Sequence, residues 1–234
     1  MFDETITRWG THSAKWDLLA AHLGEDALSL SVADMEFATC PEVSRAIVDA
    51  CAEGIFGYTE VFDDFREAAA RWQERRHGWA LEPGDVHFFP RIVQCVSALC
   101  SIVLPGSLGR PPRVVTLDPA YGPINEVVER AGCELRRVPL DLSGETPRIP
   151  EDLFARAMEG ADLLLWCSPH NPTGRVWTER EMDLVASLAC QGDVLVLSDD
   201  IHADFQRPGR NRYRPLAAVA PRLLGRDAVN GRGL

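Results

Sequence analysis

The chain has 234 residues, of which 46% are apolar and 25% charged, and its 35 acidic and 24 basic side chains give a formal net charge of −11. This length is enough for one large domain or two small ones with a real core, and the composition excludes a disordered, collagen-like or coiled-coil protein. The acidic excess argues against a protein that binds nucleic acid or an anionic membrane.

The lack of a recognisable secretory signal and the pattern of cysteines both lead us to expect a cytoplasmic protein. The N-terminal residues have neither the basic nor the apolar region of a secretory signal, and the apolar run 163–167 is far too short to span a bilayer. The seven cysteines contain no C-x-x-C pair and no zinc-ligand spacing, so we expect buried thiols in a reducing compartment. We therefore expect a soluble cytoplasmic protein.

The first third of the chain is predicted to be an irregular arm followed by two helices. Residues 1–30 are mixed in character, with one short helix expected near 16–22. Apolar residues at helical spacing predict helices over 41–51 and 63–76. The apolar residues of the second helix, Phe65, Ala68, Ala69 and Trp72, mark one of its faces.

From residue 86 onward, short apolar runs alternate with helical patterns. Strands are predicted over 86–89, 113–117, 134–138, 163–167 and 194–198. Helices are predicted over 93–104, 124–131, 151–159 and 178–189. The last helix begins at Thr178 with Glu181 three residues later, which is capping-box spacing. Strands joined by single helices, with solid apolar runs, predict an α/β fold with a mostly parallel sheet flanked by helices.

Four segments that follow predicted strands carry unusual residues, and ligands of open parallel sheets bind at that edge. The helix start in F-P-R-I-V-Q (89–94) suits a phosphate, or is a plain connection. Tyr121 in a Pro/Gly-rich turn presents a ring face to a flat ligand, or simply packs. Asn171, in the rigid string S-P-H-N-P-T-G, is an aimed donor, or part of a structural turn.

The fourth segment, S-D-D-I-H-A-D (198–204), places two adjacent carboxylates at the end of an apolar strand. A buried carboxylate is costly without a cationic partner, so Asp199 is a candidate for ligand binding, and His202 follows it closely. The alternative is that these residues cap the next element. The basic stretch 207–214 is interpreted as a solvated surface loop, with an interface or anion contact as the alternative.

N-P-T-G followed by S-D-D-I-H-A-D resembles the fold-type I pyridoxal-phosphate (PLP) enzymes, the aspartate aminotransferase superfamily. Three further strings resemble the MalY/PatB-type cystathionine β-lyases, also called cysteine-S-conjugate β-lyases. They are G-T-H-S-A-K-W-D (10–17), S-V-A-D-M-E-F (31–37) and G-Y-T (57–59). The similarity runs from about residue 8 to about residue 220.

This resemblance implies that the cofactor is PLP and assigns four residues to its ring. Asp199 pairs with the protonated ring nitrogen, and Asn171 donates to the 3-oxygen. Tyr121 stacks on the ring, and His202 occupies the place of another polar contact near the 3-oxygen.

The resemblance also implies contacts to the cofactor phosphate. The backbone at Ile92, Val93 and Gln94 would cradle it, with the helix dipole behind. Tyr58 would reach the phosphate of a neighbouring subunit, which implies a homodimer with shared active sites. The family typically has Gly where this chain has Arg91, a departure at the point of close backbone approach.

The reaction implied is α,β-elimination of an amino-acid thioether such as cystathionine, giving a thiol, pyruvate and ammonia, with the cofactor ring as electron sink. An aminotransferase of the same superfamily is the alternative enzyme. A catalytically dead fragment, or a module that binds cofactor without covalent attachment, is the alternative of a different class.

One departure from the family concerns the lysine that forms the Schiff base and then acts as the base. The resemblance predicts it near residue 231, yet residues 226–234 contain no lysine, and no catalytic residue is assigned. Lys15, the one lysine of the 234 residues, belongs to the K-W-D string and does not substitute for it. The final N-G-R-G-L (230–234) is hypothesised to be the segment that follows this lysine in relatives, with the lysine loop deleted.

The resemblance therefore divides the chain at residue 40. We expect residues 1–40 to form an N-terminal arm or small-domain segment and residues 41–234 to form an incomplete PLP-binding large domain, with the C-terminal small domain absent. Missing strands would leave an unpaired sheet edge and exposed apolar surface, so we expect poor solubility or association.

Overall fold

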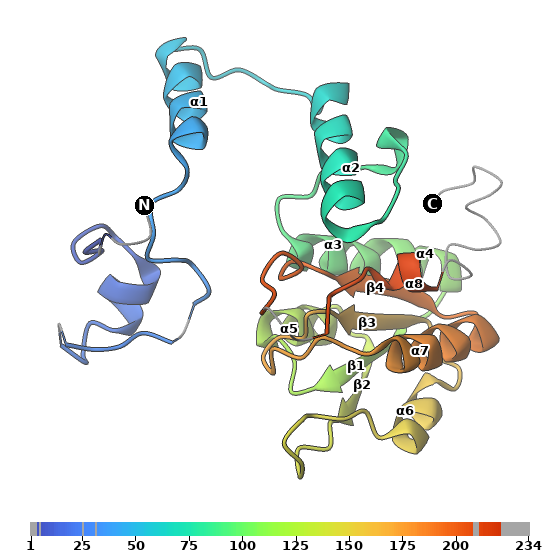
Figure 1. Cartoon of the computed structure of the whole chain (residues 1–234). Helices are drawn as coiled ribbons and strands as arrows, with labels where there is room; N and C mark the ends of the chain where they lie inside the picture. Colours follow the sequence, from blue (N-terminus) through green and yellow to red (C-terminus); the bar gives the residue numbers. More distant parts are fainter. Residues whose placement is uncertain (1–3, 5, 25, 31, 208–210, 221–234) are drawn as a thin grey trace. The chain divides into compact units, whose positions relative to one another are not determined.

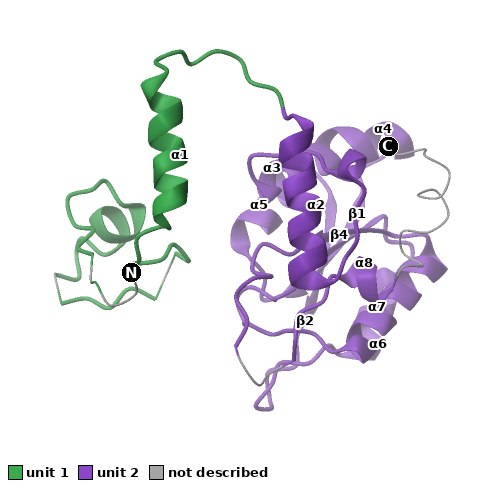
Figure 2. Cartoon of the chain, turned by 45° about the horizontal axis from the view of Figure 1, so that its top comes forward, with its two compact units in different colours: residues 1–60 green, residues 61–234 purple. Residues whose placement is uncertain are grey.

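The computed structural model describes residues 4, 6–24, 26–30, 32–207 and 211–220. The chain divides into two compact units, Met1–Glu60 and Val61–Leu234 (Figure 2). The boundary between the units lies after α1, whereas the division of the chain at residue 40 by function stays a prediction.

The first unit contains a π-helical turn, η1 (Ala14–Leu19), and one α-helix, α1 (Pro41–Ala52). The helix predicted over 41–51 is confirmed, and it begins with proline at its first position, where no backbone donor is needed. The short helix expected near 16–22 begins earlier in the chain, because Ser13 caps the turn by accepting from the Trp16 amide.

The second unit is built around a four-stranded sheet (Figure 1). Its strands are β1 (Arg113–Asp118), β2 (Glu134–Pro139), β3 (Leu163–Cys167) and β4 (Leu195–Asp199). Their order is β2-β1-β3-β4, and every pair is parallel, with Cys167 of β3 opposite Asp199 of β4. The prediction of an α/β fold with a parallel sheet is confirmed, and so are four of the five predicted strands.

Helices cover both faces of this sheet. The described helical elements of this unit are α2 (Asp63–His77), η2 (Pro83–Asp85), α3 (Ile92–Ala98), η3 (Leu99–Val103), α4 (Leu104–Leu108), α5 (Gly122–Arg130), α6 (Glu151–Met158), α7 (Glu179–Gly192) and α8 (Leu216–Val219). One core joins α6, α7 and α8 to Val115, Leu164 and Trp166. A second core joins α3, α4 and α5 to Val114 and Leu165. Successive strand residues thus enter opposite cores, as expected for a sheet covered on both faces.

The start of α7 confirms the predicted capping box. The Thr178 hydroxyl accepts from the Glu181 amide at 3.3 Å, and the Glu181 carboxylate accepts from the Thr178 amide at 2.8 Å. Two backbone donors at the helix start are therefore satisfied by a pair of side chains from the helix itself.

The predicted strand over 86–89 is wrong, because these residues form no strand and follow the short turn η2. An apolar run does not by itself supply the neighbouring strand that a sheet requires. The helix predicted over 63–76 is confirmed as α2, in which Phe65 and Trp72 of the apolar face are exposed while Ala70 and His77 are buried. The face that α2 buries is set by its neighbours in the fold.

All seven cysteines are free thiols, but they are not uniformly buried. Cys40, Cys51 and Cys190 are exposed and Cys100 is buried, so the expectation of buried thiols holds for only part of the set. In the described part of the chain, no helix is both long and apolar enough to cross a bilayer.

Candidate functional site

The parallel sheet brings three of the four suspected segments to the same edge, the one formed by the carboxyl ends of its strands. Since β1, β3 and β4 are neighbours and run in the same direction, the segments that follow them emerge together. These segments carry Tyr121 after β1, Asn171 after β3 and His202 after β4. Asp199 is the last residue of β4, so it lies at the same edge.

Asp199 is the buried carboxylate of this edge. It is 7% exposed, and burial is the main cause that raises the pKa of its carboxyl group. The Ile201 amide donates to its Oδ1 at 3.2 Å, and this bond and the nearby His202 act in the opposite direction on the pKa. A carboxylate with so little compensation for burial suits a cationic N–H ligand.

The loop after β3 is held tightly by backbone and sulfur contacts. The His170 amide donates to the Arg175 carbonyl at 2.7 Å, and the Gly174 amide donates to the His170 carbonyl at 2.7 Å. The Cys167 thiol accepts from the Asn171 amide at 3.4 Å, which ties the loop to the strand end. Asn171 is therefore presented from a fixed backbone.

A cavity of about 260 Å³ lies beside this loop. It is lined by Pro169, His170, Asn171, Pro172, Gly174, His202 and Phe205. Two predicted site residues, Asn171 and His202, are thus among the residues that line the cavity. Among the described residues its lining includes neither Asp199 nor Tyr121, so the four predicted ring contacts share an edge but not one cavity.

The predicted phosphate contacts lie at the start of α3. Arg91 is extended at the N-cap and no side chain caps the helix. Ile92 and Val93 pack against the core to which the start of α5 belongs. Tyr121 is the residue that precedes α5. Free amides at a helix start suit an anion, but the Gln94 amide already donates to the Arg91 carbonyl at 3.0 Å.

Tyr121 and Tyr58 are both accessible. Tyr121 is the N-cap residue of α5 and is 42% exposed, so its ring is free for a ligand. Tyr58 belongs to the first unit and is fully exposed, and its assignment to a partner's site stays a prediction.

Lys15 is engaged in an ionic cluster of the first unit. Its ammonium lies 2.6 Å from a Glu36 carboxylate oxygen and donates to the Asp34 carbonyl at 3.0 Å. Arg8 pairs with Asp34 at 2.6 Å, and the Lys15 side chain is only 7% exposed. A buried and paired ammonium is a poor nucleophile, which supports the expectation that Lys15 does not substitute for the Schiff-base lysine. The segment near residue 231, including 230–234, lies outside the described residues.

Several residues of this edge were missed by the sequence analysis. His170 and Phe205 line the cavity, and His170 could have been suspected from its place inside the S-P-H-N-P-T-G string. The Trp177 indole donates to the Cys167 carbonyl at 2.9 Å, a contact without any sequence signal. Tyr213 was assigned to a solvated loop, 207–214, yet it is 1% exposed.

Comparison with known proteins matches residues 25–224 to the family described as aminotransferase class I and II. Cystathionine beta-lyase PatB of Bacillus subtilis (strain 168) is 33% identical over 223 residues, which cover 94% of this chain and 56% of that protein. The chain thus spans about half the length of the curated relatives it matches.

Solved structures show the same fold. The PLP-bound putative aminotransferase from Clostridium difficile 630 gives a TM-score of 0.84 at 27% identity, over 95% of this chain and 57% of that one. The PLP-bound C-S lyase from Staphylococcus hominis gives a TM-score of 0.82 at 28% identity, over 94% of this chain and 56% of that one. With the family match over most of the sequence, the chain belongs to the aminotransferase class I and II family.

Proposed function

We propose that this chain is part of a PLP-dependent carbon–sulfur β-lyase that converts cystathionine or a cysteine S-conjugate into a thiol, pyruvate and ammonia. The observation that carries the proposal is Asp199, buried at the carboxyl end of β4 and little compensated by protein donors. The similarity to proteins named cystathionine beta-lyase and C-S lyase supports the choice of reaction.

The residues present fit PLP at the edge of the sheet. In this proposal Asp199 pairs with the ring nitrogen, and the Asn171 amide donates to the 3-oxygen, with His202 close to the same oxygen. Tyr121 stacks on the ring, and the backbone of Ile92 and Val93 receives the phosphate. When bound, PLP supplies an electron sink for the bond that breaks at Cα.

The charge of Asp199 is the part of this arrangement that matters chemically. An ionised carboxylate keeps a proton on a paired ring nitrogen, and burial strengthens that interaction by excluding water. Asn171 orients the ring from a loop that Cys167 ties to β3. Gln94 contributes less to phosphate binding in this proposal, since its amide has an internal acceptor.

Removal of the Cα proton requires a base, and the family uses a lysine for it. With Lys15 buried in an ion pair and no lysine near 231, we expect the 234-residue chain to bind PLP without turnover. Tyr58 and the homodimer belong to the same proposal, with Tyr58 reaching the partner's phosphate. The cytoplasmic location also stays a prediction.

The test is equilibrium binding of PLP to the purified chain, followed by the quenching of tryptophan fluorescence. Asp199→Asn keeps the shape of the side chain but loses its charge, so the dissociation constant should rise about tenfold or more. Asp152→Asn, which removes an exposed carboxylate from α6, is the matched control and should bind like wild type. Equal affinity of wild type and Asp199→Asn would reject the proposal.

A second measurement separates lyase from aminotransferase and from a non-catalytic chain. Reading the coding sequence beyond codon 220 in all frames shows whether a lysine loop is encoded. If a lysine loop is encoded, the longer protein that contains this loop should release pyruvate from cystathionine without a keto-acid acceptor. A requirement for the acceptor would favour the aminotransferase, which the similarity to a putative aminotransferase supports. A stop without a lysine would favour the non-catalytic alternative.

A further inference from the structure

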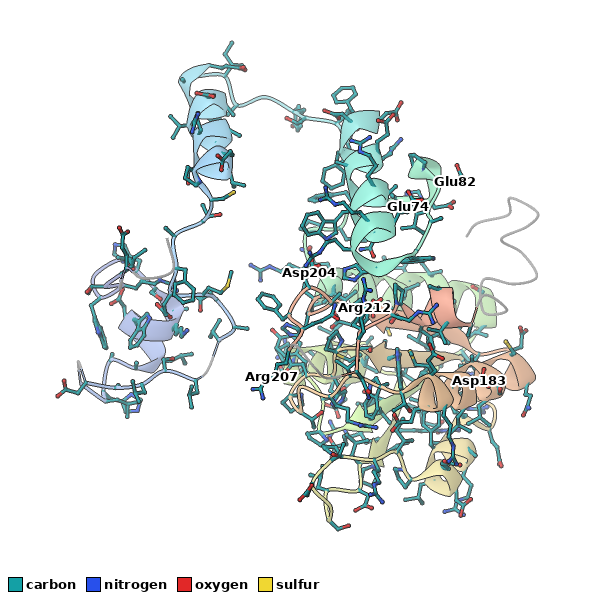
Figure 3. All side chains as sticks on the ribbon, in the orientation of Figure 1. Glu74, Glu82, Asp183, Asp204, Arg207 and Arg212 are labelled. Atoms are coloured by element: carbon teal, nitrogen blue, oxygen red, sulfur yellow. The ribbon has the colours of Figure 1, made fainter. Side chains whose placement is uncertain are left out.

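Asp204, the last acid of the S-D-D-I-H-A-D string, has no part in the contacts proposed for the cofactor. Its carboxylate instead accepts hydrogen bonds from α2. The Trp72 indole nitrogen lies 3.0 Å from Oδ2, and the Arg76 Nε lies 3.4 Å from Oδ1. The His77 Nε2 lies 3.2 Å from Oδ1. Figure 3 shows Asp204 beside the C-terminal end of α2, with Arg212 close by.

His77 forms the buried side of this contact, whereas the Asp204 side chain is 41% exposed. The His77 side chain is 1% exposed, and its ring packs edge-on against buried Tyr213 at 5.1 Å between centroids. Its Nδ1 is buried and has no hydrogen-bond partner among the described residues. The polar interaction of this imidazole therefore runs through Nε2 to Asp204.

Asp204 lies between the two residues of its loop that line the cavity, His202 and Phe205. We call residues 200–206 the His202 loop. Within it, the Ala203 amide donates to the Asp200 carbonyl at 2.9 Å and the Phe205 amide donates to the His202 carbonyl at 3.0 Å. These bonds hold both chain neighbours of Asp204, Ala203 and Phe205, against the rest of the loop.

The other end of the His202 loop is anchored to the sheet and to Tyr213. The Asp200 carboxylate accepts from the Ser198 hydroxyl at 2.9 Å and from the Tyr213 hydroxyl. Since Tyr213 also packs on His77, both anchors of the loop meet at the end of α2. Without Asp204, the loop would lose its bonds to α2 and keep its anchor at Asp200 and the bond that the Gln206 side chain accepts from the Tyr213 amide at 3.1 Å.

We propose that Asp204 is a positioning residue that fastens the His202 loop to the end of α2 and so sets the position of His202 at the cavity. The part of this proposal that concerns the cofactor rests on the proposed function. The part that concerns the loop stands on the geometry alone and is tested without cofactor.

The experiment is hydrogen–deuterium exchange of the His202 loop in the cofactor-free chain. In Asp204→Asn, the Ala203 and Phe205 amides should exchange about tenfold faster or more after correction for intrinsic rates, because a charged acceptor is lost. Amides of β1 and β3 should keep their protection. Glu67→Gln is the matched control, since it removes an exposed carboxylate of α2 that pairs only within the helix, with Arg71.

Two further variants keep the test decisive if Asp204→Asn fails to fold. Trp72→Phe removes one donor but keeps an aromatic ring, and should accelerate loop exchange by a smaller factor. Asp204→Glu keeps the charge and should restore part of the protection. Loop exchange that is unchanged in both Asp204→Asn and Trp72→Phe, or changed equally in Glu67→Gln, would overturn the proposal.

PLP binding then separates the two proposals. If wild type binds PLP, Asp204→Asn should raise the dissociation constant severalfold with unchanged protection of β1 and β3, and an unchanged constant would refute the link to the cofactor. If wild type does not bind PLP, the proposed function fails, while the exchange data still decide whether Asp204 holds the loop.

Discussion

Two titratable side chains beside the candidate site, one buried and one half-buried, have their neutral forms favoured by loss of solvent. Burial lowers the pKa of His170 to about 4 and raises the pKa of Asp200 to about 6. A histidine with a lowered pKa stabilises the fold above its unfolded pKa, and that contribution is lost as pH falls towards 4. A carboxyl group with a raised pKa does the opposite, since its contribution is lost as pH rises through 6. The two contributions oppose each other between pH 4 and 6.

The contribution of His170 to the pH dependence of stability is therefore best measured by comparing wild type with a variant that lacks this side chain. His170→Asn removes the imidazole whose Nδ1 lies 2.8 Å from the Thr173 hydroxyl. The difference in free energy of unfolding between wild type and variant should shrink by up to about 3 kcal/mol from pH 7 to pH 4. Urea denaturation at a series of pH values measures it.

The control for this prediction is His87→Asn, which removes an exposed histidine of the same unit. Its difference from wild type should depend little on pH. A His170→Asn difference that stays constant, or that grows as pH falls, would contradict the assignment of a neutral buried imidazole.

At the scale of an element, α7 shows how a helix start supports the site. Its N-cap follows Trp177, whose indole is bonded to the end of β3, so the capping box also closes the loop that carries Asn171. Thr178→Ala should lower the free energy of unfolding by about 1 kcal/mol, because the Glu181 amide loses the hydroxyl that accepts its hydrogen bond.

Chemical denaturation measures this change. Thr146→Ala, at an exposed loop position, provides the matched control and should change stability by less than about 0.5 kcal/mol. Equal stabilities of the two variants would show that the capping box contributes nothing in this context.

At the scale of the whole molecule, β4 is exposed along one edge. Among the described strands it pairs only with β3, and Leu195, Ile201 and Phe205 in or just after it are exposed. An open strand edge with nearby apolar side chains favours pairing with another chain. We predict that the purified chain associates, which sedimentation velocity would detect.

A lysine on the edge should reduce that association, as it does at natural edge strands. Leu195→Lys is therefore expected to sediment closer to a monomer than wild type. Leu142→Lys, at an exposed loop position, adds the same charge elsewhere and should leave association unchanged. A monodisperse wild-type monomer would contradict this prediction.

Local patterns were sufficient for much of the fold and for the expectation that the candidate residues lie at one end of the sheet. Short apolar runs predicted β1, β3 and β4, because both faces of a covered sheet need apolar side chains, whereas β2 carries three charged residues in E-L-R-R-V-P. The spacing of Thr178 and Glu181 predicted a helix start for a similarly local reason. The expectation that Asn171 and Asp199 lie at the same end of the sheet needed only the rule that parallel strands share a carboxyl edge, whereas their assignment to one ligand rests on the family resemblance and stays a prediction.

Contacts between distant segments required the folded chain. The order β2-β1-β3-β4 places Cys167 opposite Asp199, and the packing of α2 brings His77 to Tyr213 and Asp204. Residue spacing along the chain does not predict which distant segments become neighbours in the fold. The same limit explains the absent strand at 86–89, because pairing depends on which other segments are available.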